Sequence, residues 1–232
     1  MYRRLSRIVL VMIVALVSSG ATEMRAQDET YRFDLGAGVG MSGYLGDVNR
    51  SNMFRRPGFV AQLSFRHLID TRWAIRTLFT TASLSGNSAD FGEVFPGGAA
   101  YSFRSQIYDL GCRAEFNFFS YGIGETYKRL RRWSPYMALG VGVTLGNPGD
   151  GVYAGFSVPM AFGVKFKVRP RLNIAAEFCV TKVFSDHIDG KDLSDLYQIK
   201  TSFLKNTDWH SNILISISYE FGKRCETCHY VD

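Results

Sequence analysis

Residues 31–41 read Tyr-Arg-Phe-Asp-Leu-Gly-Ala-Gly-Val-Gly-Met, so that apolar residues alternate with polar residues or glycine. Alternation with a period of two predicts a β-strand with one apolar face. The same pattern returns at residues 58–68, 73–84, 103–118, 135–145, 157–168, 172–184 and 209–221. Because a helical period of 3.6 is absent, the chain is predicted to be all-β with eight strands.

Two architectures use such strands. A soluble sandwich or lipocalin-like barrel turns its apolar face inward, whereas a membrane barrel turns that face toward lipid. The predicted polar faces carry acids and bases that can pair across a narrow lumen: Asp34, Arg76, Asp109, Arg113, Glu115, Lys165, Glu177 and Glu220. Aromatic residues near the strand ends suit an interfacial girdle, namely Trp73, Tyr136, Phe166, Trp209, Tyr219 and Phe221.

Strand length and number complete the prediction. Most of the predicted strands are about 10–13 residues long, and a tilted spanning strand needs about 9–11 residues. Eight strands enclose a lumen that side chains just fill. We therefore predict an eight-stranded antiparallel transmembrane β-barrel with a filled lumen.

The composition fits an exported domain. The chain has 232 residues, of which 46% are hydrophobic and 21% charged, with four Cys. This composition excludes a disordered chain and a disulfide-dense scaffold. Arg3, Arg4 and Arg7 precede the apolar run Ile8–Val17, so residues 1–26 are expected to be a signal peptide. Residues 27–221 then form the barrel, and 222–232 form a short periplasmic tail.

The connections between the predicted strands differ in length and charge. The longer ones cover 44–56, 85–102, 146–156 and 186–207, and their formal charges total −2. The turns near 66–72, 119–134 and 165–171, with the tail, total +8. Short turns and both termini lie on the periplasmic side in outer-membrane barrels. We therefore expect a barrel in the cell outer membrane with a basic periplasmic end.

This basic end is the candidate functional surface. A surface of one charge sign attracts and selects partners of the opposite sign, which indicates docking of an acidic periplasmic protein. Attraction to anionic lipid headgroups is the alternative interpretation, and the compartment excludes nucleic acid. The candidate partner-binding residues are Lys128, Arg129, Arg131, Arg132, Lys167, Arg169 and Arg171.

Other chemical signals are weak. Gly38–Gly43 matches GxGxxG, but a turn follows where a nucleotide site needs a helix. The four His lack metal-ligand spacing, so no catalytic, cofactor or metal residue is assigned. Ser185, Asp186, His187 and Asp189 could serve an outer-membrane lipid hydrolase or acyltransferase, but the preferred interpretation is a solvated loop entry. Cys225 and Cys228 suit a local disulfide or a covalent link to a partner.

Six short motifs carry a family resemblance. The chain resembles the PorG-like outer-membrane barrels of the Bacteroidota type IX secretion system. The motifs are Tyr44-Leu45-Gly46-Asp47, Glu115-Phe116-Asn117-Phe118, Ser134-Pro135-Tyr136, Pro159 to Lys165, Asn173 to Glu177 and Asn206-Thr207-Asp208-Trp209.

The resemblance implies a non-enzymatic structural role. Such barrels anchor a periplasmic ring, which consists of a lipoprotein and its associated subunit, to the outer membrane. The competing expectations are a small OmpA- or OmpW-like barrel for solute passage, a surface adhesin that uses the long segment 186–207, and a lipid-modifying enzyme.

Overall fold

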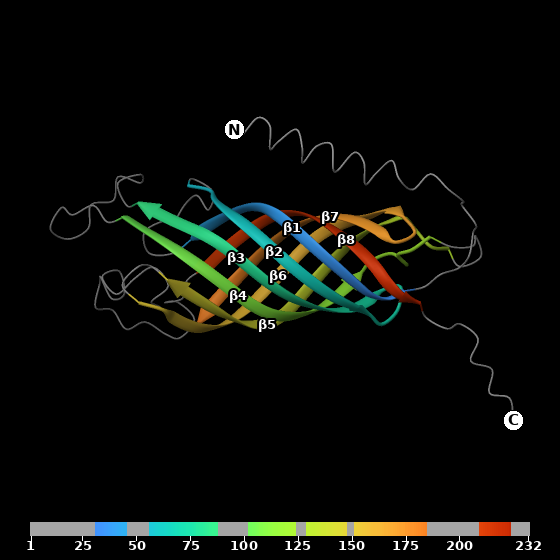
Figure 1. Ribbon diagram of the computed structural model, residues 1–232, viewed down its shortest axis with the longest axis horizontal. Helices are drawn as coiled ribbons and strands as arrows, with labels where there is room; N and C mark the ends of the chain where they lie inside the picture. Colours follow the sequence, from blue (N-terminus) through green and yellow to red (C-terminus); the bar gives the residue numbers. More distant parts are fainter. Residues whose placement is uncertain are drawn as a thin grey trace, which may run out of the picture.

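The computed structural model describes residues 31–45, 56–87, 102–123, 129–147, 151–184 and 209–223. They form eight antiparallel strands in sequence order around one closed barrel (Figure 1). The strands are β1 (Tyr31–Leu45), β2 (Gly58–Leu68), β3 (Trp73–Asn87), β4 (Ser102–Asn117), β5 (Trp133–Asn147), β6 (Tyr153–Arg169), β7 (Leu172–Phe184) and β8 (Trp209–Lys223). The predicted fold class is confirmed, and no helix in these ranges is long and apolar enough to cross a membrane.

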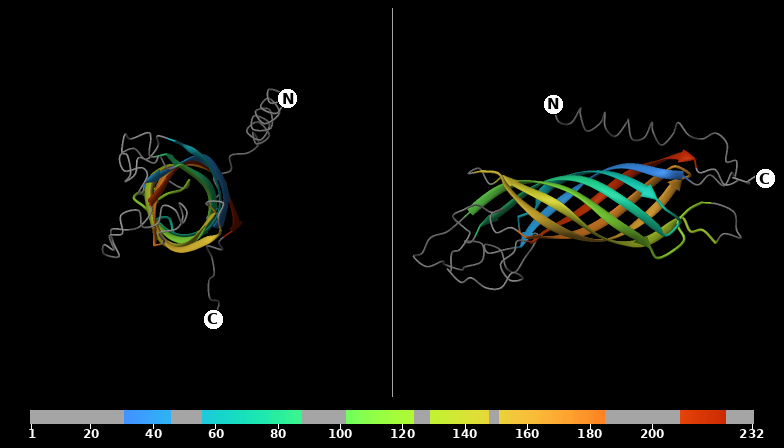
Figure 2. Two further views of the ribbon diagram at one scale, coloured as in Figure 1. Left: turned by 90° about the vertical axis from the view of Figure 1, so that its left-hand side faces the viewer. Right: turned by 90° about the horizontal axis from the view of Figure 1, so that it is seen from below.

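The barrel closes between its first and last strands. Pairing of β1 with β8 runs from Tyr31 opposite Lys223 to Leu45 opposite Trp209. The end-on view in Figure 2 shows the resulting continuous ring. Closure leaves no unpaired strand at a sheet edge, as a lipid environment requires.

The two ends of the barrel differ. We call the end at which β1 begins and β8 ends the turn end, because residues 69–72, 118–132 and 170–171 connect strands there. The opposite, loop end receives the connections 46–57, 88–101, 148–152 and 185–208. The predicted signal peptide and the tail from residue 224 onward lie outside the described residues.

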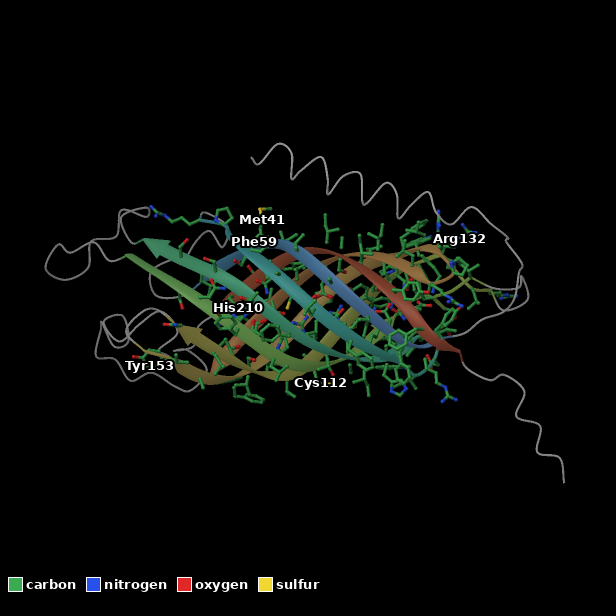
Figure 3. The ribbon with its side chains drawn as sticks, in the orientation of Figure 1. Met41, Phe59, Cys112, Arg132, Tyr153 and His210 are labelled. Carbon is green, nitrogen blue, oxygen red and sulfur yellow. The ribbon has the colours of Figure 1, made fainter. Side chains whose placement is uncertain are left out.

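The outer surface of the barrel is apolar along every strand. Eight residues, one from each strand, are 39–62% exposed: Leu35, Leu63, Phe79, Leu110, Val141, Phe162, Phe178 and Ile215. Figure 3 shows Met41, Phe59 and Cys112 directed away from the barrel. A soluble protein rarely exposes so large a contiguous apolar surface. The soluble lipocalin-like alternative is therefore wrong, and the outer surface is that of a membrane-spanning barrel.

Two of the aromatic residues expected on this outer surface lie inside. Tyr136 is 1% exposed, and Gly163 stands opposite it on β6. A Cβ at Gly163 would lie 2.6 Å from Cζ of Tyr136, so glycine gives the ring its place in the lumen. Tyr31, predicted to share the outward face of Phe33, is 5% exposed at the turn end.

The lumen is filled in two layers of different chemistry. Toward the loop end, apolar side chains pack together inside the barrel: Val60, Ala82, Leu84, Ile107, Val183 and Leu214. Toward the turn end, the interior is ionic. The alternation pattern predicted the ionic layer and missed the apolar one, because Val60 and Ile107 interrupt otherwise polar faces.

Candidate functional site

The turn end of the barrel is built on a buried network of ion pairs. Glu115 lies at its centre and accepts from Lys165 Nζ at 2.5 Å and from Arg66 Nε at 3.1 Å. Arg66 also donates to Asp34 at 2.7 Å. Four strands contribute these four side chains, because β1, β2, β4 and β6 each place a charged residue inside near this end. The network therefore ties opposite walls of the barrel together.

Glu177 organises the adjoining part of the network. It pairs with Arg76 and accepts from Arg113 at 3.1 Å. The Tyr136 hydroxyl donates to the same carboxylate at 2.6 Å. Closer to the loop end, His210 and Asp109 form a separate pair at 3.1 Å, and Figure 3 shows His210 inside the barrel.

The charges of the described lumen are balanced. The cationic side chains are Arg66, Arg76, Arg113, Lys165 and Lys167, and the carboxylates are Asp34, Asp109, Glu115, Glu177 and Glu220. Every acid and base that the sequence placed on the lumen face is buried or nearly so, and the predicted pairing across the lumen is confirmed. Because these lumen charges cancel, the net charge of the molecule comes from residues outside the lumen.

Tyr121 covers the network at the turn end. It lies in the segment 118–132 between β4 and β5, and its hydroxyl donates to Asn173 Oδ1 at 2.7 Å. Lys165 Nζ and Lys167 Nζ lie 4.8 and 5.3 Å from the centre of its ring, within the range of a cation–π contact. Burial, followed by the charge of Glu220, raises the pKa of Tyr121 well above its usual range, so the phenol keeps its proton.

The return half of this segment carries exposed arginines. Arg129, Arg131 and Arg132 are all exposed, and Figure 3 shows Arg132 at the turn end. The Arg131 guanidinium lies 4.3 Å from the ring centre of Phe119, which packs edge-on against Trp133. An aromatic ring orients the guanidinium without neutralising its charge.

The backbone of Arg129 has an unusual conformation. Its φ of 50° places it in the left-handed region, which costs a non-glycine residue roughly 1–2 kcal/mol. Glycine would adopt this conformation without that cost. In the part of the chain that the structure describes, Arg129, Arg131 and Arg132 form no ion pair with a carboxylate.

The other residues predicted for partner binding have different positions. Lys167 is 4% exposed and binds both oxygens of Glu220 at 2.6 Å inside the lumen, so its predicted place on the surface is wrong. Side chains alternate along β6, and because the neighbours Phe166 and Val168 point outward, the Lys167 side chain points into the lumen. Arg169 and Arg171 are half-buried, and Arg171 donates to the hydroxyl groups of Tyr31 and Tyr219.

Several predicted residues fall outside the described ranges. These are Lys128 of the basic run, Cys225 and Cys228 of the tail, and the constellation Ser185, Asp186, His187 and Asp189. Of the two described cysteines, Cys112 is exposed on the outer face and Cys179 is buried inside. Within the described residues, no group of His, Cys, Asp and Glu can hold a metal ion.

Sequence reasoning missed Tyr121. Alternation placed Arg66 on the polar face of its strand, while the charge sum also counted it with the basic turn. Arg66 is 5% exposed and continues the inward face of β2. Tyr121 follows β4 outside any alternating run, so no periodicity marked it. Its position becomes evident only when β6 and β7 bring Lys165, Lys167 and Asn173 around it.

Comparison with known proteins supports the fold. A family model described as "Domain of unknown function (DUF6089)" matches residues 6–230. None of the curated proteins matches the chain. Among solved structures, Neisserial surface protein A (NspA) is 12% identical with a TM-score of 0.53, and the match covers 82% of this chain and 97% of that one.

Two further solved structures are similar over comparable lengths. Ail, the attachment invasion locus protein of Yersinia pestis, is 13% identical with a TM-score of 0.46, covering 82% of this chain and 99% of its own. OprG from Pseudomonas aeruginosa is 10% identical with a TM-score of 0.44, covering 83% and 97%. At 12% identity the likeness to NspA shows the barrel fold alone.

Proposed function

The chain belongs to the DUF6089 family. We propose that this member of the family is a structural outer-membrane component of the type IX secretion apparatus. In this role the barrel is not an enzyme. Its turn end faces the periplasm with both termini and anchors a periplasmic ring, which consists of a lipoprotein and its associated subunit.

The motifs that carry the resemblance support this proposal. Glu115, Tyr136, Lys165 and Glu177 each belong to one of them. All four side chains meet in the ion network beneath the turn end. The residues shared with the PorG-like barrels therefore lie in the ion network that supports the turn end of the barrel. A protein that docks through this end requires such support.

The observation that carries the proposal is the exposed basic surface formed by Arg129, Arg131 and Arg132, which we call the docking surface. Lumen carboxylates neutralise the buried bases, whereas these three arginines remain without a carboxylate partner in the described part of the chain. An acidic protein would supply carboxylate partners for these arginines. Complementary charge also accelerates the encounter of the two proteins and selects the partner.

Charge reversal tests the proposal. Replacing Arg129, Arg131 and Arg132 together by Glu changes the local charge from +3 to −3 and is expected to release the ring subunits from the barrel and lower secretion. The measurement is co-purification of periplasmic proteins with the tagged barrel from outer membranes. Arg131→Glu and Arg32→Glu form a matched pair, because exposed Arg32 lies on β1, four strands away from β5.

Loss of partners in the triple variant and in Arg131→Glu, with retention in Arg32→Glu, supports docking at this surface. Retention of the same partners by the triple variant contradicts it. A correctly folded variant is recognised by its heat-modifiable migration in gels, so misfolding does not imitate loss of docking.

Solute passage is the alternative, and the packed lumen predicts against it. Two layers of side chains cross the barrel interior, and eight strands leave little room beyond them. We expect the purified barrel in planar bilayers to show no steady open-channel current. Stable, ohmic conductance that scales with the amount of inserted protein would instead favour an OmpW-like channel. Adhesion through residues 186–207 concerns a segment outside the described residues.

A further inference from the structure

The segment between β4 and β5 has two halves that are joined to each other. Residues 118–122 lead away from β4, and residues 129–132 return to β5. Gly122 N donates to Arg131 O at 3.0 Å, and Arg131 N donates to Ser120 O at 2.8 Å. Tyr121 and Arg131 form a parallel β-bridge between the halves. The backbone of the docking surface is therefore fixed to the backbone of Tyr121.

The first half is in turn fixed to the barrel. Tyr121 N donates to Thr71 O in the β2–β3 turn at 3.1 Å, while its side chain enters the ion network. Asn173, which accepts from the Tyr121 hydroxyl, donates to Asp34 at 3.1 Å and to Glu220 at 2.9 Å. Lys167 holds the same Glu220 carboxylate. Tyr121 thus joins a surface segment to the four strands β1, β6, β7 and β8 through their inward side chains.

From this geometry we infer that Tyr121 is a positioning residue, through which the buried ion network holds the docking surface in its binding conformation. The inference rests on the proposed docking of an acidic partner at Arg129, Arg131 and Arg132. While Tyr121 is seated, Ser120 and Gly122 hold Arg131 by two hydrogen bonds, and Phe119 orients its guanidinium. Withdrawal of Tyr121 releases both constraints.

Thermodynamic linkage gives the inference a second consequence. If the seated conformation binds an acidic partner more tightly, then the bound partner stabilises the seated conformation by the same factor. Binding at the exposed arginines is therefore expected to reach the lumen side chains through Tyr121. Docking would tighten the turn end of the barrel and would not open it.

The experiment measures binding of fluorescent poly-L-glutamate to the barrel in phosphatidylcholine vesicles, whose lipid carries no net charge. Tyr121→Ala removes the ring and the hydroxyl, and is expected to weaken binding about tenfold, a coupling of ordinary size. Tyr121→Phe keeps the ring under Lys165 and Lys167, and is expected to lie between Tyr121→Ala and the unchanged protein. Phe118→Ala, a change at an exposed residue of the same segment, is the control and is expected to bind normally.

Hydrogen exchange provides the independent readout. Poly-L-glutamate is expected to slow exchange of the Tyr121 and Gly122 amides, which donate to Thr71 and Arg131. The inference is overturned if Tyr121→Ala binds as the unchanged protein does while replacement of the three arginines by Gln abolishes binding. If the Gln variant also binds normally, the docking surface itself is wrong, so the two failures are distinguishable.

Discussion

Replacing Glu115 by Gln is expected to cost about 3–5 kcal/mol of the free energy of unfolding, since a buried charge loses its partner. Glu115 is fully buried and faces Arg66, Arg76 and Lys165. Arg66 and Arg76 keep Asp34 and Glu177, whereas Glu115 is the carboxylate that Lys165 contacts. The amide removes one negative charge and leaves that ammonium group without its carboxylate partner in the closed lumen. The measurement is urea unfolding of the barrel in lipid vesicles, followed by tryptophan fluorescence.

A double-mutant cycle separates the pair from its surroundings. Adding Lys165→Met to Glu115→Gln removes the stranded charge, so the two effects are expected to be less than additive by about 0.5–3 kcal/mol. Asp70→Asn is the matched control, because this carboxylate is exposed and, within the described residues, accepts from the backbone of Arg72 and Trp73. Its expected cost is about 1 kcal/mol or less. Strict additivity of Glu115→Gln and Lys165→Met would show that the network does not act as a unit.

Leu110→Arg is expected to cost about 2–4 kcal/mol, the penalty of a cation on the lipid face near the middle of the membrane. Leu110 is 60% exposed on the outer face of β4, midway along a strand that runs from Ser102 to Asn117. The unfolding free energy in lipid vesicles measures the effect.

Val168→Arg provides the depth control for this substitution. Val168 is an outward residue one position before the end of β6, where the arginine head group reaches the interface and costs about 0–1 kcal/mol. Equal costs at the two positions would mean that the cost of an arginine does not depend on its depth in the membrane. That result would contradict a membrane-spanning orientation.

The sequence was sufficient to predict the strands, because each strand carries its own periodicity. Leu172–Phe184 and Gly58–Leu68 were predicted to the residue, whereas β6 begins at Tyr153, four residues before the predicted start. Strand ends are less certain, since apolar and polar alternation fades where lipid gives way to water. Which charged residues share the lumen was also evident, because residues on one face of a strand point the same way.

The exposure of residues near strand ends was less predictable. Lys165 and Lys167 were counted with the exposed residues Arg129, Arg131 and Arg132 when the charge of the turn end was summed. Formal charge along the sequence does not reveal whether a side chain continues the inward face of its strand or begins the turn. The burial of Lys165 and Lys167 removes both from the proposed docking surface.

What the sequence determined by itself is the all-β barrel, the outward apolar surface and the identity of the lumen charges, since each depends on alternation within single strands. Only the tertiary structure decided which charges pair, that apolar residues fill the loop end of the lumen, and that Tyr121 joins the exposed arginines to the network. Those features depend on strand register and tilt, which bring residues such as Arg76 and Glu177, 101 positions apart, into contact. No local pattern encodes such a meeting, because it arises from the closure of the whole sheet.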